Sequence, residues 1–157
     1  MLDRRRFLTV LGAAGAALTA GPSFAQAAPP KVVVSQDPSC GCCTGWVDHL
    51  RKAGFAADVV ETSEINSVKA RLGVPDDLAS CHTGEIAGYV IEGHVPADAI
   101  KRLLAERPAG KGLAVAGMPM GSPSMEMEGM APDTYEVVLF GPFGNRTFAR
   151  YEGARLL

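Results

Sequence analysis

Three cysteines lie within four consecutive positions in the first third of the chain. Cys40, Cys42 and Cys43 follow an apolar run at residues 31–34 and precede an amphipathic segment that begins near Trp46. This order predicts a β-strand, a short turn and the first turn of a helix. A helix N-terminus presents unpaired N–H groups and the positive end of the helix dipole, which favours loss of a thiol proton. Because thiolate is the form that attacks disulfides and binds metals, the segment predicts redox or metal chemistry.

The cysteine spacing leaves several chemistries open. Cys40 and Cys43 have the C-x-x-C spacing of a thiol–disulfide oxidoreductase, but Cys42 adds a third thiol that would form competing disulfides. Three thiolates suit a soft metal such as Cu(I), zinc or iron in an Fe–S cluster. Cys81 with the adjacent His82 also permits a Cys3His zinc site, and an Fe–S cluster would use all four thiols. Two structural disulfides fit less well, because bridges within one crowded turn close little loop.

The methionines favour copper among these metals. Five of the six lie within residues 118–130. Thioether sulfur is a soft ligand that suits Cu(I) and does little for zinc, so Met118 and Met120 are predicted copper ligands. Met125, Met127 and Met130 fit equally well as flexible side chains on an exposed or partner-binding surface.

The histidines give weaker signals. His82 is a candidate metal ligand because it adjoins Cys81. His94, shortly before Pro96, fits helix capping or a hydrogen bond to a ligand as well as ligation. His49 is expected on the solvated face of the first helix, and Trp46 is expected in the core, where it would also shield the site from water.

The N-terminal segment, residues 1–27, has the layout of an export signal. Consecutive arginines at 4–6 precede an apolar stretch, and Ala25-Gln26-Ala27 supplies an A-x-A cleavage site. Paired arginines before Phe-Leu fit the twin-arginine type. An uncleaved membrane anchor is the alternative, but the apolar run is shorter than the ~20 residues of a spanning helix. We therefore expect a periplasmic protein in which residues 28–157 form one domain.

Alternating patterns predict an α/β fold. Strands are expected at residues 31–36, 57–61 and 86–91, and a terminal β-hairpin at 135–140 and 146–151. Helices are expected from Gly41 to Ala53, from a Ser63 cap to Leu72, and from Pro96 to near Arg107-Pro108. Residues 109–133, rich in Met, Gly and Pro, show little regular pattern and predict a long extension loop. A thiol turn that opens the first helix after the first strand favours a thioredoxin-like mixed sheet with flanking helices and one antiparallel edge.

Charge excludes some classes of partner. The net charge of −2 and the lack of a basic stripe give no support to nucleic-acid binding. Beyond the leader, no apolar run is long enough to span a membrane. We expect a monomer whose partners are copper ions and periplasmic efflux or chaperone proteins.

Four motifs in this order resemble the CopG-like periplasmic copper proteins. The matching segments are Cys-Gly-Cys-Cys at 40–43 with Trp46, Cys-His-Thr at 81–83, residues 88–96, and Gly-Met-Pro-Met-Gly-Ser-Pro at 117–123. The resemblance implies a thioredoxin-like domain whose C-terminal extension completes a multinuclear, sulfur-bridged copper site used in copper detoxification. It implies that Cys40, Cys42, Cys43 and Cys81 are core ligands and that Met118 and Met120 come from the extension. The chain departs from the family pattern after Pro123, where Ser124-Met125 replaces an expected Gly-Met.

Three functions remain open from the sequence. The first is a copper-binding protein that interconverts Cu(I) and Cu(II) in copper resistance. The second is a thioredoxin-type thiol–disulfide oxidoreductase. The third is a passive copper chaperone that hands metal to an efflux system.

Overall fold

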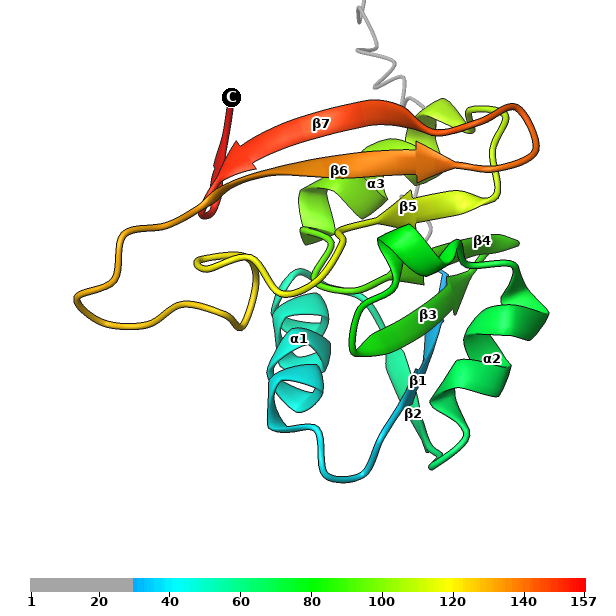
Figure 1. The fold of residues 1–157 in the computed structure, drawn as a ribbon, viewed down its shortest axis with the longest axis horizontal. Helices are drawn as coiled ribbons and strands as arrows, with labels where there is room; N and C mark the ends of the chain where they lie inside the picture. The colour runs from blue at the N-terminus through cyan, green and yellow to red at the C-terminus, as the bar shows by residue number, and fades with distance from the viewer. Residues whose placement is uncertain (1–29) are drawn as a thin grey trace, which may run out of the picture.

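Strands and helices alternate through the first half of the chain in the computed structural model, which describes residues 30–157 (Figure 1). The strands are β1 (Val32–Gln36), β2 (Ala57–Glu61), β3 (His82–Ile86), β4 (Tyr89–Glu92), β5 (Gly112–Ala114), β6 (Thr134–Phe140), β7 (Arg146–Glu152) and β8 (Arg155–Leu156). The helices are α1 (Gly41–Lys52), α2 (Ile65–Leu72), α3 (Ala97–Glu106) and a short 3-10 turn, η1 (Asp76–Leu78). The expected export signal lies outside the described residues.

Within residues 30–157, eight strands form one mixed sheet in the order β2-β1-β3-β4-β5-β6-β7-β8. The β1–β2 and β4–β5 pairs are parallel, and the other neighbours are antiparallel. The first part, β1-α1-β2-α2-β3-β4-α3, is compatible with the predicted thioredoxin-like fold, and the predicted α/β class is confirmed. Antiparallel pairing is more extensive than the single edge we expected, because β3 pairs antiparallel with both β1 and β4 in the middle of the sheet.

Alternating side chains bury the two faces of the sheet in different clusters. In β4, Ile91 belongs to the larger cluster, which also contains Trp46 of α1 and Ile100 of α3. Its neighbour Val90 belongs to a smaller cluster with Leu72 of α2. Side chains one residue apart on a strand point to opposite faces. Therefore α1 and α3 cover one face and α2 covers the other.

The predicted α1 follows from the spacing of its apolar residues. Trp46, Val47 and Leu50 lie on one side of the helix and are 0–1% exposed. Burying side chains of this size contributes roughly 1.5–3 kcal/mol each. The Trp46 indole also donates a hydrogen bond to the Val95 carbonyl at 2.9 Å. The tip of the first helix is thereby fixed against the segment that leads into α3.

Three local predictions were wrong. The single strand expected at 86–91 is divided between two strands of a hairpin: Ile86 ends β3, residues 89–91 lie in β4, and Ala87 and Gly88, both with positive φ, form the turn. The segment 109–133 contains a strand, β5, between the sheet core and the terminal hairpin. The residue before α2 is Glu64 rather than Ser63, and its backbone N–H bonds to the Thr62 hydroxyl.

Because β5 takes up part of the predicted loop, the extension loop comprises residues 115–133. It leaves β5, contacts α1 through Ser124 and projects from the body before β6 begins (Figure 1). Within residues 30–157, no helix has the length and apolarity needed to cross a membrane.

Candidate metal centre

The N-terminus of α1 carries three of the four thiols. Cys40 is the residue before the helix and forms a disulfide with Cys43 in its first turn, with the two Cα atoms 5.5 Å apart. Cys42 remains a free thiol, and its Sγ lies 3.4 Å from that of Cys40. Cys43 is fully buried, whereas Cys40 and Cys42 are partly exposed. The turn therefore presents two sulfur atoms outward and one inward.

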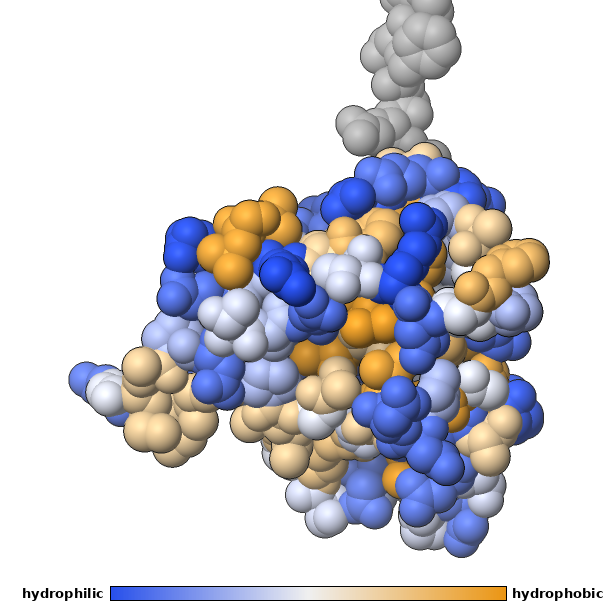
Figure 2. Space-filling model, turned by 45° about the horizontal axis from the view of Figure 1, so that its top comes forward, coloured by the Kyte–Doolittle hydropathy of each residue, from blue (hydrophilic) through white to orange (hydrophobic). Residues whose placement is uncertain are grey.

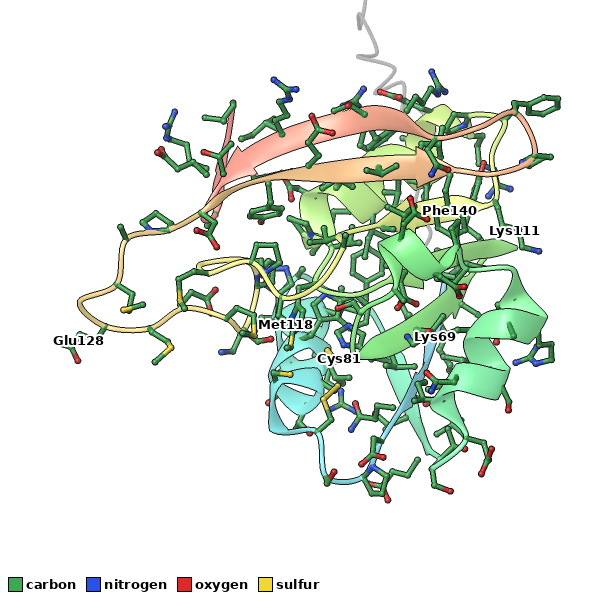
Figure 3. The ribbon with its side chains drawn as sticks, viewed as in Figure 1. Lys69, Cys81, Lys111, Met118, Glu128 and Phe140 are labelled. Atoms are coloured by element: carbon green, nitrogen blue, oxygen red, sulfur yellow. A yellow bond between two sulfur atoms is a disulfide. The ribbon has the colours of Figure 1, made fainter. Side chains whose placement is uncertain are left out.

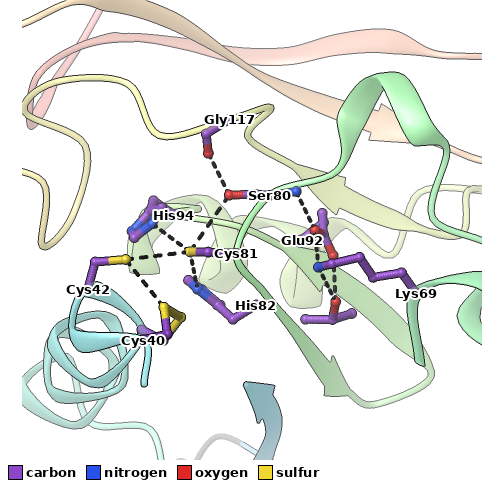
Figure 4. A network of polar contacts seen from close by, with 11 residues as sticks. Cys40, Cys42, Lys69, Ser80, Cys81, His82, Glu92, His94 and Gly117 are labelled. Atoms are coloured by element: carbon purple, nitrogen blue, oxygen red, sulfur yellow. Dashed lines mark hydrogen bonds and ion pairs between the residues drawn. A yellow bond between two sulfur atoms is a disulfide. The ribbon is translucent and has the colours of Figure 1, made fainter. Parts of the chain in front are cut away.

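The fourth thiol comes from the start of the strand that pairs with β1. Cys81 precedes β3, and its Sγ lies 3.7 Å from that of Cys42 (Figure 4). The sulfur atoms of all four cysteines lie within 4.8 Å of one another. The antiparallel β1–β3 pairing explains this meeting, because it places the start of β3 beside the end of β1 that leads into α1.

Cys81 belongs at the same time to a second group of ligand atoms. Its Sγ lies 3.2 Å from His82 Nδ1 and 3.1 Å from His94 Nε2. These three atoms also lie within 4.8 Å of one another. Neither group contains a carboxylate. Two sets of soft and intermediate donors therefore adjoin and share one thiol.

Hydrogen bonds set the tautomer of His94. Its Nδ1 lies 2.9 Å from the Pro123 carbonyl, which only accepts, so Nδ1 carries the proton. The Ser124 hydroxyl donates to the Cys42 carbonyl at 2.8 Å and accepts from His94 Nδ1 at 3.2 Å. Nε2 is consequently unprotonated and faces Cys81. A carbonyl that orients a histidine in this way is the usual outer partner of a metal ligand.

Burial keeps this group in its uncharged form. Burial, with a smaller effect of Cys42, raises the pKa of the Cys81 thiol to about 12. Burial also lowers the pKa of His82 to about 3, assisted by the charges of His94 and Lys69, and it lowers the pKa of His94. A cation that binds here displaces the thiol proton and meets neutral imidazoles.

His82 is packed against Trp46 but has one unsatisfied atom. The two rings have centroids 4.3 Å apart, and the side chain of His82 is fully buried. Its Nε2 has no hydrogen-bond partner among the described residues. An unpaired buried nitrogen costs roughly 1–3 kcal/mol, so this histidine is kept at the expense of stability.

A buried ion pair holds the segment that carries Cys81. Lys69 of α2 contacts Glu92 of β4 at 2.5 Å, and both side chains are nearly inaccessible to solvent. Glu92 also accepts from the Ser80 backbone N–H at 2.7 Å and from the Thr83 hydroxyl at 2.6 Å. These bonds fix Ser80, before Cys81, and Thr83, after it, to the same carboxylate (Figure 4).

The extension loop covers the same region at two points. The Ser80 hydroxyl donates to the Gly117 carbonyl, which places the backbone of Met118 beside the Ser80–Cys81 segment. Farther along, Ser124 packs on Gly45 of α1, where an added Cβ would lie 2.7 Å from the Ser124 Cβ. Only glycine allows that approach. In Figure 3 Met118 lies on the side of the loop toward Cys81, and Glu128 lies at its far tip.

The chain matches known proteins at this site and over most of its length. Residues 78–125, from Leu78 at the end of η1 through Met125, match the family model described as "Protein of unknown function, DUF411". Two solved structures of the copper resistance protein CopG, form 1 and form 2, match with TM-scores of 0.74 and 0.73. They are 44% and 42% identical to the chain, cover 80% and 78% of it, and are themselves covered over 99% and 98%. The chain belongs to the CopG family. No curated protein sequence matches it.

The donor set of this CopG family member fits a soft ion. Its two ligand groups contain sulfur and imidazole nitrogen only, the set that selects copper or zinc over magnesium, calcium or manganese. The structure brings Cys40, Cys42, Cys43 and Cys81 together with His82 at the N-terminus of α1, a group called the thiol site below. Together with the family relationship, the cluster supports a copper-related function.

The structure places the two remaining histidines. For His94 the sequence allows helix capping, a hydrogen bond to a ligand or ligation, and in the structure its Nε2 faces Cys81. The signal that identifies it, the Pro123 carbonyl, lies 29 residues away in the chain. His49 is half-buried rather than solvated, and its Nε2 accepts a hydrogen bond from the Ala97 N–H at the start of α3.

The predicted methionine ligands are divided by the fold. Met118 is 54% exposed and follows Gly117 directly. Met120 donates its backbone N–H to Asp133 and lines a separate surface depression with Met127 and Met130. Met125 is partly buried near the Ser122 turn. The sulfur-rich loop therefore contributes to more than one surface.

Proposed function

We propose that this CopG family member holds more than one copper ion in its cysteine-rich site and serves copper resistance in the periplasm, where it interconverts Cu(I) and Cu(II). The proposed ligands are Cys40, Cys42, Cys43, Cys81 and His82, with His94 added from the geometry and Met118 from the extension loop. Met120, the second methionine predicted from the sequence, lines a separate depression and is left out of this cluster.

The observation that carries this proposal is the sharing of Cys81. Its sulfur belongs both to the group of four thiols and to the group with two imidazoles. A thiolate has lone pairs enough to bridge two soft ions, so one ion in each group would be joined through Cys81. A single ion would leave donors of one group unused, and this supports a multinuclear site.

The mixture of donors supports a redox role. Thiolates and thioethers favour Cu(I), whereas imidazole nitrogen also suits Cu(II). His82 and His94 are neutral and, in the case of His94, oriented by the Pro123 carbonyl. Imidazoles beside the thiolates would therefore narrow the difference in affinity between the two oxidation states.

The Cys40–Cys43 disulfide and a four-thiolate copper site exclude each other, because a disulfide sulfur is no longer a thiolate. Filling the site requires the disulfide to accept two electrons and two protons from a thiol reductant, and copper then displaces the protons. We accordingly expect the oxidised protein to bind less copper than the reduced protein.

Metal analysis of the reduced protein tests the proposal. Protein prepared without oxygen is titrated with Cu(I) under a competing chelator, and copper per chain is measured for wild type, Cys42→Ser and, as a control on the exposed face of α1, Thr44→Ser. We expect more than one copper per chain in wild type and the control, and loss of the additional copper in Cys42→Ser. Stoichiometric zinc with no preference for copper would reject the proposal.

A thiol–disulfide oxidoreductase is the second candidate, favoured by the disulfide at a helix N-terminus next to a free thiol. It predicts that the metal-free protein reduces a disulfide substrate, with Cys40 and Cys43 cycling at a measurable potential. Absence of such reduction with and without metal would exclude it. A passive copper chaperone for an efflux system is separated from the redox protein by a transfer assay, since it passes Cu(I) on without change of oxidation state.

A further inference from the structure

Beyond the thiol site, the outer part of the extension loop forms a depression whose walls are largely methionine. It has a volume of about 350 Å³, and Met120, Met127 and Met130 line it together with Pro132. Met127 and Met130 are 59% and 56% exposed. Figure 2 shows apolar atoms on the projecting end of the loop. Three flexible thioethers thus share one open surface.

The loop is held in this shape by backbone contacts. Met120 and Asp133 exchange two hydrogen bonds, from the Met120 N–H to the Asp133 carboxylate and from the Asp133 N–H to the Met120 carbonyl. Within the loop, the Met130 N–H bonds to the Met127 carbonyl at 3.2 Å. The two ends of the segment therefore meet, and Met127 and Met130 are kept within one tight turn.

The floor of the depression is built at close range. An added Cβ on Gly121 would lie 2.8 Å from Pro132 and 3.1 Å from Gly153, and Gly121 has a φ of +79°. Tyr135, a buried residue of the core, donates its hydroxyl to the Gly153 carbonyl at 2.9 Å. The methionines are consequently presented on a base that is joined to the core.

Within the described part of the chain, one unpaired carboxylate, that of Glu126, lines the depression beside the thioethers. Glu126 and Glu152 line the depression, and Arg155, which also lines it, is paired with Glu152. Glu126 also lines the hollow on its other side that contains Gly45, His49 and Ser124. It therefore stands between the methionines and the part of α1 that leads to Cys42. A monovalent cation would be attracted here, and thioethers bind soft cations in preference to hard ones.

We propose that Met120, Met127 and Met130 form a second, exposed binding site for a soft monovalent ion, Cu(I) or Ag(I), separate from the thiol site. Met127 and Met130, which the copper cluster proposed above does not use, carry this inference. With neutral ligands and open access to solvent, the site releases its ion more readily than a thiolate cluster does, which suits capture of an ion before transfer.

The test is a titration of the full chain, reduced and without oxygen, with Ag(I), while the ε-methyl resonances of ¹³C-labelled methionine are followed by NMR. We expect the thiols to take the first equivalents and later equivalents to shift the methyls of Met120, Met127 and Met130. Met127→Leu/Met130→Leu keeps the apolar volume and should lose the later equivalent. Met125→Leu, the same exchange in the same loop but outside the depression, should keep it.

Unshifted Met127 and Met130 methyls at saturating Ag(I), or an unchanged stoichiometry in the double leucine variant, would overturn the inference. The latter result would assign the depression to apolar docking, because leucine serves such a contact as well as methionine. The titration is repeated in Cys42→Ser/Cys81→Ser protein. In that variant the methyl shifts should persist. An error in the proposed thiol site can therefore be distinguished from an error in the proposed methionine site.

Discussion

The sulfur atoms of this protein lie in two regions with opposite surroundings. At the thiol site, Cys43, His82 and His94 are fully buried, and the donors come from α1, β3 and the segment after β4. In the extension loop, Met118, Met127 and Met130 are more than half exposed and come from one continuous stretch. Burial lets the first region exclude water and control the protonation of its ligands. Exposure gives the second region rapid access to solvent. On the two proposals made above, the buried region would retain an ion and the exposed region would capture one.

The largest effect is expected from the residue on which the buried region is centred. Cys81→Ser removes the sulfur shared by both ligand groups while it preserves size. We expect copper affinity to fall by more than the ~10–100-fold that follows loss of an outer partner. Competition with a Cu(I) chelator measures this change. Retention of the full copper content would mean that copper binding does not depend on Cys81, which would contradict a buried site centred on this residue.

A second prediction asks whether the buried region depends on the core. Lys69→Met leaves the Glu92 carboxylate buried without its partner, and breaking such a pair costs roughly 3–5 kcal/mol. Urea unfolding of the metal-free protein measures the free energy. Lys69→Met/Glu92→Gln removes the charge but keeps an acceptor for the Ser80 N–H, so we expect it to recover part of the loss. Equal stability of Lys69→Met and wild type would contradict the role of the pair.

A third prediction concerns the cost of burying an imidazole. The pKa of His82 is lowered from 6.5 to about 3, so the folded protein binds fewer protons than the unfolded protein between these values. Protonation of His82 therefore favours the unfolded protein in this range. The free energy of unfolding is not reduced by this effect above pH 6.5 and falls as the pH is lowered toward 3. From pH 6.5 to about pH 4.5 we expect His82 to account for a loss of about 2 kcal/mol.

His82→Gln isolates that contribution because glutamine does not titrate. Urea unfolding of the metal-free wild type and variant at both pH values gives the difference in slope. If the two proteins lose stability in parallel, His82 is not held neutral by burial, and the contrast between the two regions weakens.

The sequence predicts well those features that depend on neighbouring residues. The apolar spacing in α1, the alternation in the terminal hairpin and the thiols of residues 40–43 are all local patterns. The hairpin of β3 and β4 was missed because its turn, Ala87-Gly88, lies within an apolar run. The buried Lys69–Glu92 pair was missed because each charge is satisfied only by a residue on another element.

The imidazole half of the site depends on contacts that the sequence does not display. His94 is oriented by Pro123 and Ser124, which reach it only after the extension loop folds back on α1. Ser124, which departs from the expected family pattern, therefore has a structural role: its hydroxyl joins the Cys42 carbonyl to His94. Neither feature has a periodic or spacing signal.

Ser124 is the contact between the two regions and the source of the smallest expected effect. It has a φ of +70°, which is unfavourable for a residue with a Cβ, and its hydroxyl joins the Cys42 carbonyl to His94. Ser124→Gly relieves the backbone strain and removes the hydroxyl, two effects of about 1 kcal/mol with opposite sign. We therefore expect almost unchanged stability by urea unfolding but a several-fold lower copper affinity, because His94 keeps only the Pro123 carbonyl to orient it. Ser124→Ala keeps the strain and loses the hydroxyl, so it should lose both stability and affinity. Unchanged affinity in both variants would show that the extension loop covers the thiol site without helping to order its ligands.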